Sequence, residues 1–121
     1  MSDKLQKKII SLKQNDFKYF FKGSKRLSTQ LVNFYLKPNG LAVARLGIVI
    51  KKLHVKTAVK RNKIKRIVRE HFRPRMNHFF GYDVVILVNK FQNETLISSF
   101  RAEFEKQWLK LEKFSQRYLS N

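Results

Sequence analysis

The sequence of 121 residues predicts one α+β domain, a small sheet with helices packed against it. Residues 30–37 and 43–52 have strand patterns, and Pro38-Asn39-Gly40 between them is a strong turn signal. The continuous apolar run over residues 84–88 is typical of a strand inside a sheet. The regions around this run show the apolar spacing of α-helices. The expected order is therefore helix, two or three strands, helix, strand and helix.

The first helix is expected over residues 17–22, where Asp16 can cap the N-terminus and Gly23 ends the helix. The strand over residues 30–37 is rich in β-branched and aromatic residues. The strand over residues 43–52 alternates, so its side chains should face opposite sides of the sheet in turn. One side carries Leu46, Ile48 and Ile50, and the other carries Gly47, Val49 and Lys51.

Two longer helices follow from apolar residues that recur at about 100° per residue. The first runs from about Thr57 to Phe72, and Pro74 should end or kink it. Its apolar face carries Ile64, Ile67, Val68, His71 and Phe72. Its opposite face carries Asn62, Arg66, Arg69 and Arg73, with Lys65 at the edge. The last helix runs over about residues 94–118, with a core-facing stripe of Ile97, Phe100, Phe104, Trp108, Leu111 and Phe114 or Ser115.

The chain carries a large excess of positive charge, and this excess is uneven. There are 27 Lys and Arg against 8 Asp and Glu, a net charge of +19. Eleven of the basic residues, and only one acid, Glu70, lie within residues 51–75, and eight more lie within residues 1–26. Such an excess destabilises a compact protein by self-repulsion, so a polyanionic partner is expected. With 0 Cys and no apolar run of about 18 residues, the sequence predicts a soluble cytoplasmic protein without disulfides or a membrane span.

Catalytic and metal-binding patterns are missing from the sequence. The three histidines, His54, His71 and His78, lack the i, i+4 spacing of a helical metal site. His71 lies toward the apolar face of its helix, so packing is its expected role. The acids are few, and none forms the pair that a two-metal nuclease site requires. We therefore predict no catalytic and no metal-ligating residues.

The basic helix is the strongest functional signal. Arg66, Arg69 and Arg73 follow one another at i, i+3 and i+7, so their guanidinium groups lie along one face. The guanidinium fork matches phosphate oxygens, which suits contact with an RNA backbone. The alternative is a solvated amphipathic helix. Solvated faces usually mix positive and negative residues, and the single acid among eleven bases favours RNA binding.

Aromatic residues near lysines form a second signal. Phe17 and Phe21 are i, i+4 in the first predicted helix, and Lys18 and Lys22 lie beside them. Exposed rings can stack on unpaired bases while the cations hold the phosphates. The alternative for any single ring is core packing.

The central motif closely resembles the signature of the bacterial ribonuclease P protein subunit family. The matching residues are Arg45-Leu46-Gly47-Ile48, Lys52, Ala58, Arg61-Asn62-Lys63-Ile64-Lys65-Arg66, Arg69-Glu70 and Phe72-Arg73. The resemblance covers nearly the whole chain as a single domain, residues 1–121. It implies a ribosomal protein S5 domain 2-like fold, with a central mixed sheet of about four strands and three helices. It also implies a left-handed strand–helix–strand crossover, a hand that is rare.

The same resemblance implies a function. The protein would be the small subunit of a ribonucleoprotein that removes the 5′ leader from precursor tRNA. The RNA subunit would hold the catalytic Mg²⁺ and carry out the chemistry. The implied partners are this catalytic RNA and precursor tRNA, with no membrane and no obligate protein partner.

The resemblance also assigns roles to individual positions. It implies RNA binding by Lys52, Lys56, Arg61, Asn62, Lys65, Arg66, Arg69 and Arg73. It implies a cleft for the single-stranded leader that is lined by Phe17, Phe21 and Phe34, with Lys51 supplying charge. Two positions depart from the family pattern: Leu53 stands where a second Lys is common, and Lys63 replaces the usual Arg.

Two other hypotheses remain open from the residues alone. One is a structural RNA-binding protein such as a ribosomal component, which would copurify with ribosomal subunits. The other is a protein-only nuclease, which would cleave precursor tRNA without an RNA subunit.

Overall fold

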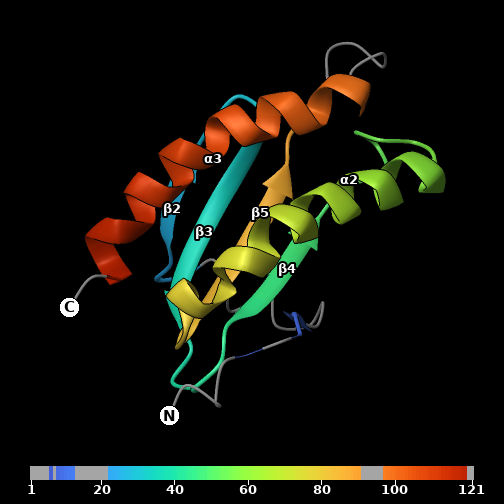
Figure 1. Cartoon of the computed structure of the whole chain (residues 1–121). Helices are drawn as coiled ribbons and strands as arrows, with labels where there is room; N and C mark the ends of the chain where they lie inside the picture. Colours follow the sequence, from blue (N-terminus) through green and yellow to red (C-terminus); the bar gives the residue numbers. More distant parts are fainter. Residues whose placement is uncertain (1–5, 7, 13–21, 91–96, 120–121) are drawn as a thin grey trace.

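A single five-stranded sheet forms the centre of the fold. The computed structural model of the chain describes residues 6, 8–12, 22–90 and 97–119. The strands lie in the spatial order β1-β4-β5-β3-β2. Their bounds are Ile10–Ser11 for β1, Lys25–Ser28 for β2, Val32–Pro38 for β3, Arg45–Val49 for β4 and Tyr82–Val88 for β5. Figure 1 shows this sheet behind the two helices.

The central strand, β5, pairs on both sides, so the sheet is mixed as expected. It runs parallel to β4, with Leu46 opposite Val84, and antiparallel to β3, with Leu36 opposite the same residue. The turn signal at residues 38–40 is confirmed, but β3 and β4 do not pair, because β5 lies between them. In Figure 1 the connection from β4 through the helix on the near side to β5 turns left-handed.

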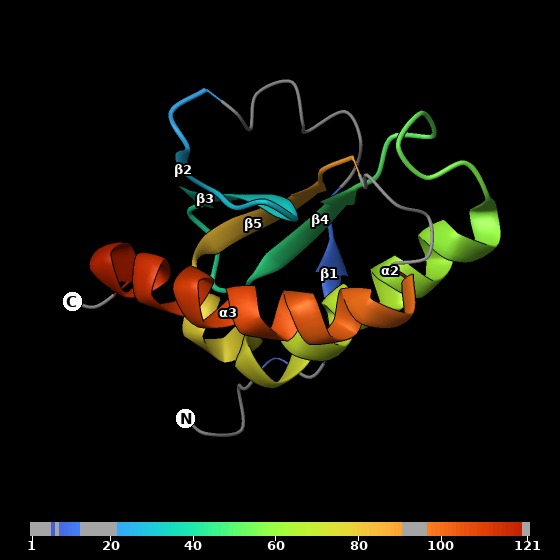
Figure 2. The ribbon, with the colours of Figure 1, turned by 90° about the horizontal axis from the view of Figure 1, so that it is seen from above.

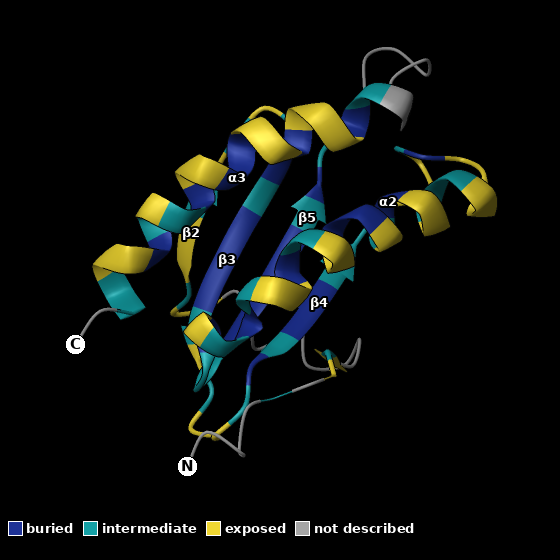
Figure 3. Cartoon of the chain, viewed as in Figure 1, coloured by how far each residue is buried: buried dark blue, intermediate teal, exposed yellow. Residues whose placement is uncertain are grey.

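The helices cover one face of the sheet (Figures 1 and 2). They are α2 (Ala58–Phe72), the 3₁₀ segment η3 (Arg73–Phe79) and α3 (Ile97–Leu119). Their inward faces and the facing strands form the main core, which Figure 3 shows in dark blue. Its largest fully buried side chains are Phe34, Phe72, Phe100, Phe104, Leu36, Ile64, Ile86 and Leu111. The core-facing stripe predicted for the last helix is confirmed from Phe100 to Leu111.

Local signals define α2 closely. Thr57 is its N-cap, and the Thr57 hydroxyl accepts a hydrogen bond from the backbone N–H of Lys60 at 3.3 Å. The predicted helix from Thr57 to Phe72 is therefore confirmed. Pro74 does not stop the chain from coiling: it lies in the first turn of η3, where the missing N–H of proline costs little. Pro74 was predicted to end or kink the helix. The α-helix ends at Phe72, two residues before Pro74, and the chain continues as a 3₁₀ segment from Arg73.

The predicted number of elements needs correction. The described residues contain five strands rather than about four. The two short edge strands, β1 and β2, were not predicted, because so few residues show no alternation in the sequence. They also contain two α-helices. The helix predicted over residues 17–22 lies outside the described residues, and so do residues 94–96 of the last predicted helix.

The sheet face opposite the helices carries a smaller apolar cluster. Its buried members are Leu12, Tyr35 and Val85, and Val49 and Leu87 pack beside them. Adjacent residues of one strand thus serve different faces, since Phe34 belongs to the main core and Tyr35 to this second cluster. The alternation predicted for β4 is confirmed, with Leu46 and Ile48 in the main core and Val49 on the other face.

Candidate nucleic-acid interface

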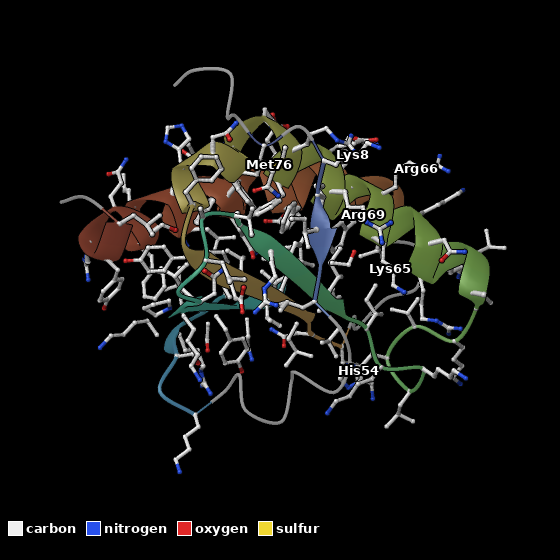
Figure 4. The ribbon with its side chains drawn as sticks, turned by 90° about the horizontal axis from the view of Figure 1, so that it is seen from below. Lys8, His54, Lys65, Arg66, Arg69 and Met76 are labelled. Carbon is white, nitrogen blue, oxygen red and sulfur yellow. The ribbon has the colours of Figure 1, made fainter. Side chains whose placement is uncertain are left out.

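The outer face of α2 is exposed and basic. Burial of Ile64, Ile67, Val68 and Phe72 holds the opposite face of the helix on the sheet. The four residues predicted for the outer face, Asn62, Arg66, Arg69 and Arg73, are all exposed, and Lys65 is half-buried at the edge. The packing of one face therefore determines that the guanidinium groups point to solvent. Figure 4 shows Arg66 and Arg69 at this surface.

The arginines on this face are not paired with carboxylates in the part of the chain that the structure describes. Within the described residues, no carboxylate forms an ion pair with Arg66, Arg69 or Arg73. The one acid of α2, Glu70, instead pairs with Arg101 of α3. The hydrogen bond from Arg101 and the positive charge of this residue lower the pKa of Glu70. The negative charge is thus directed to the flank beside α3, and the outer face of α2 keeps its positive potential.

The loop between β4 and α2 adds lysines to the same end of the molecule. Lys51, Lys52 and Lys56 are exposed there, as the predicted RNA-binding and leader-binding roles require. Arg61 has a different environment. One of its guanidinium nitrogens donates to the carbonyl oxygens of Val55 at 2.7 Å and Lys56 at 3.0 Å. Arg61 therefore fixes the path of the loop that carries the lysines.

A hollow of about 390 Å³ lies between α2 and the edge of β4. Lys65 and Arg69 contribute its charged wall, and the remaining lining is mainly apolar: Ser11, Leu12, Leu46, Ile48, Val49 and Ile50. Within the described residues β1 pairs with Arg45 and Leu46, at the start of β4 next to this hollow. An apolar floor with a cationic rim fits a group that has both a ring and a phosphate.

Of the three rings expected to line the leader cleft, the described residues contain Phe34, and its burial contradicts that role. Phe34 is 0% exposed and packs against Phe79 and Phe114 beneath the helices. A ring buried in the main core cannot stack on a base. Tyr35 is the aromatic residue of β3 on the opposite sheet face. Phe17 and Phe21 lie outside the described residues.

Asp83 and His71, which were considered for catalysis, both make contacts that stabilise the fold. Asp83 accepts two hydrogen bonds from Arg45, both at 2.8 Å, and a third from the Asn39 amide at 2.9 Å. His71 packs edge-on against Phe104 and contacts the Ile67 carbonyl, so the packing role predicted for this histidine is confirmed. The described residues contain no group of three His, Cys, Asp or Glu side chains placed to hold a metal ion. Their helices also lack the length and apolarity that a membrane span requires.

One basic residue near this surface was missed by the sequence reasoning. Lys8 precedes β1, and Figure 4 shows it on the side of the fold that carries Arg66 and Arg69. The eight basic residues of the first 26 were the available signal, but nothing local tells which of them approaches α2.

A small mixed sheet that presents an unneutralised basic helix defines a protein that binds a nucleic-acid backbone. Comparison with known proteins identifies the kind. The family model for Ribonuclease P matches residues 5–112. The ribonuclease P protein component of Aliivibrio fischeri is 34% identical over 105 residues, which are 87% of this chain and 90% of that protein. The component of Nitrosococcus oceani is 37% identical over 102 residues, 81% and 82% of the two chains.

Solved structures agree with this assignment. The ribonuclease P protein of Thermotoga maritima superposes with a TM-score of 0.66 at 31% identity and covers 84% of this chain and 93% of its own. That of Staphylococcus aureus has a TM-score of 0.73 at 23% identity and covers 94% and 100%, and it supports the fold alone.

The chain belongs to the ribonuclease P protein family. It is the protein subunit of the ribonucleoprotein that processes the 5′ end of tRNA, and so part of an endoribonuclease with an RNA partner. The alternative of a ribosomal component is not favoured.

Proposed function

We propose that two surfaces of the protein bind two different RNAs. The outer face of α2, with the lysines of the β4–α2 loop, binds the catalytic RNA of ribonuclease P. The sheet face opposite the helices, with the hollow beside α2, binds the single-stranded 5′ leader of precursor tRNA. The complex acts in the cytoplasm and removes the leader by phosphodiester hydrolysis.

The unneutralised arginine face of α2 is the observation that carries the first half of the proposal. Arg66, Arg69 and Arg73 are exposed, and their guanidinium groups have no carboxylate partner within the described residues. Bound phosphates would relieve the repulsion among them and release counterions from the RNA. Such contacts recognise the backbone rather than the base sequence.

The second half rests on a row of residues across the open sheet face. Val49, Leu87 and Asn33 are half-buried neighbours on three adjacent strands, in matched register. Apolar side chains beside a polar amide suit an unpaired base, because the ring of the base can pack on the apolar side chains while its polar edge forms hydrogen bonds with the amide. In this proposal Lys65, at the rim of the neighbouring hollow, contacts a phosphate of the same strand, and Arg69 stays with the catalytic RNA.

The chemistry in this proposal belongs to the RNA subunit, which holds the catalytic Mg²⁺. The protein contributes binding: it lowers the electrostatic repulsion between the catalytic RNA and the substrate, and with it the Mg²⁺ concentration that the reaction needs. Asp83, the most buried carboxylate of the described residues, already serves Arg45 and Asn39.

The leader surface is tested with one substitution and a matched control. Leu87→Glu places a negative charge on the proposed leader path, and Leu109→Glu places the same charge on α3, where the leucine is 64% exposed. Holoenzyme reconstituted with Leu87→Glu should bind leader-containing precursor tRNA more weakly than wild type, and bind mature tRNA equally well. Leu109→Glu should affect neither. Equal effects of the two substitutions on precursor binding would contradict the leader assignment.

The division of chemistry is tested by reconstitution. Pure protein is incubated with precursor tRNA and Mg²⁺, and the catalytic RNA is added afterwards. Cleavage at the mature 5′ end should begin only after that addition. Specific cleavage by the protein alone would show that the chain is a nuclease in its own right.

A further inference from the structure

A glutamine near the N-terminus holds the chain against β4. The Gln6 side-chain amide donates to the carbonyl oxygens of Ala44 at 2.9 Å and of Lys8 at 2.8 Å. Its oxygen accepts from the Ala44 N–H at 2.8 Å. The Gln6 backbone N–H donates to the Asn77 side chain in η3 at 3.0 Å. One residue thus joins the N-terminal arm to the start of β4 and to the helix layer.

These bonds determine where the following residues lie. The chain continues into β1, which pairs parallel with β4, with Ile10 opposite Arg45 and Ser11 opposite Leu46. Ser11 lines the same hollow as Arg69, so this short strand lies next to the basic flank of α2. Lys8, two residues before the strand, is exposed and lies on the side that carries Arg66 and Arg69 (Figure 4).

Cations from two distant parts of the chain thus lie on one side of the fold (Figure 4). Among the described residues no carboxylate forms an ion pair with Lys8, Arg66 or Arg69. Like charges held together on a surface repel one another, and an anion bound among them reverses the sign of the interaction. Gln6 holds the arm with a neutral amide that both donates and accepts. A glutamate at this position lacks the two donor bonds and would place a negative charge beside the cluster.

We propose that Lys8, Arg66 and Arg69 form one phosphate-binding cluster, assembled from two distant parts of the chain, and that Gln6 is the positioning residue for Lys8. The ligand is the phosphate backbone of the catalytic RNA, so this inference rests on the function proposed for α2. It extends the RNA surface beyond the basic helix to the N-terminal arm.

The test is a double-mutant cycle on Gln6 and Lys8. Binding of each variant to the in vitro transcribed catalytic RNA is measured over a range of salt concentrations. Loss of one phosphate contact lowers the salt slope by about 0.9, which reduces the ratio of affinities at about 50 and 200 mM salt roughly threefold. Lys8→Ala should show this loss, and Lys8→Arg should keep the wild-type slope. Lys110→Ala, which removes an exposed lysine from α3, is the control and should also keep it.

Gln6→Ala should reproduce much of the Lys8→Ala loss, and adding Gln6→Ala to Lys8→Ala should change the slope no further. Thermal melting of each variant accompanies the binding data. A Gln6→Ala variant that melts lower but keeps the wild-type slope, or additive slope losses in the double variant, would overturn the positioning role. Unchanged binding by Lys8→Ala would overturn the cluster. If Arg66→Ala with Arg69→Ala also leaves binding unchanged, the function proposed for α2 fails as well, and the two failures are thereby told apart.

Discussion

Replacing Arg66 and Arg69 together by alanine is the most direct perturbation of the RNA surface. Both side chains are exposed on the outer face of α2 and, within the described structure, have no ion-pair partner. Their removal therefore breaks no internal contact of that kind, and we expect the free energy of unfolding to change by less than about 0.5 kcal/mol. A loss of RNA binding can then be attributed to the missing charges.

The expected magnitude follows from the number of charges. If each guanidinium neutralises one phosphate, the slope of log affinity against log salt falls by about 0.9 per residue, or about 1.8 for the pair. Between about 50 and 200 mM salt, the ratio of the two affinities should then shrink by about tenfold. The measurement is equilibrium binding to the catalytic RNA at four or more salt concentrations, with wild type and variant side by side.

A matched control removes two cations from another exposed helix face. Lys106→Ala with Lys110→Ala takes the same charge from α3, which belongs to the nearly neutral C-terminal part of the chain. This control should keep the wild-type slope within error. A slope that is unchanged in the Arg66 and Arg69 variant, or reduced equally in both, would refute the assignment of α2 to the RNA.

Four further outcomes are expected. Asp83→Ala leaves the guanidinium that it holds without a carboxylate and should cost about 3 kcal/mol in urea unfolding, at the lower end for a broken buried pair. Phe34→Ala should cost about 3–5 kcal/mol by opening a cavity in the main core. In NMR titrations the pKa of Glu70 should lie below its ordinary value and rise in Arg101→Ala; the ion pair stabilises the fold above the unfolded pKa and is lost as pH falls through the lowered folded pKa. Arg61→Ala should speed amide exchange over residues 52–57, because both loop carbonyls lose their donor.

Patterns within short stretches predicted much of the fold and the exposed basic face of α2. The α2 helix was predictable because its cap, its apolar stripe and its arginine face all lie within 16 residues, from Thr57 to Phe72. The continuous apolar run of β5 correctly indicated a strand with neighbours on both sides, as its place between β4 and β3 confirms. In both cases the pattern lies within one segment: an apolar stripe at helical spacing in α2 and an uninterrupted apolar run in β5.

The position of Phe34 shows what such patterns do not predict: which face of the sheet a side chain occupies. Phe34 and Tyr35 are adjacent aromatic residues in a strand, and a period of two assigns them to opposite faces without saying which face each takes. Pairing with β2 and β5, and the helices packed on one side, decide that Phe34 is buried in the main core. The period of two alone therefore did not reveal that Phe34 is buried.

The sequence by itself predicted a basic α+β fold with an arginine-faced helix, because charge and hydrophobic period are local properties. The tertiary structure alone decided the rest. It inserted β5 between β3 and β4, paired Glu70 with Arg101, and put Lys8 on the side of the fold that carries Arg66. These features join segments that are distant in the chain. They depend on which surfaces the whole fold buries together, and a short stretch of sequence carries no information about that.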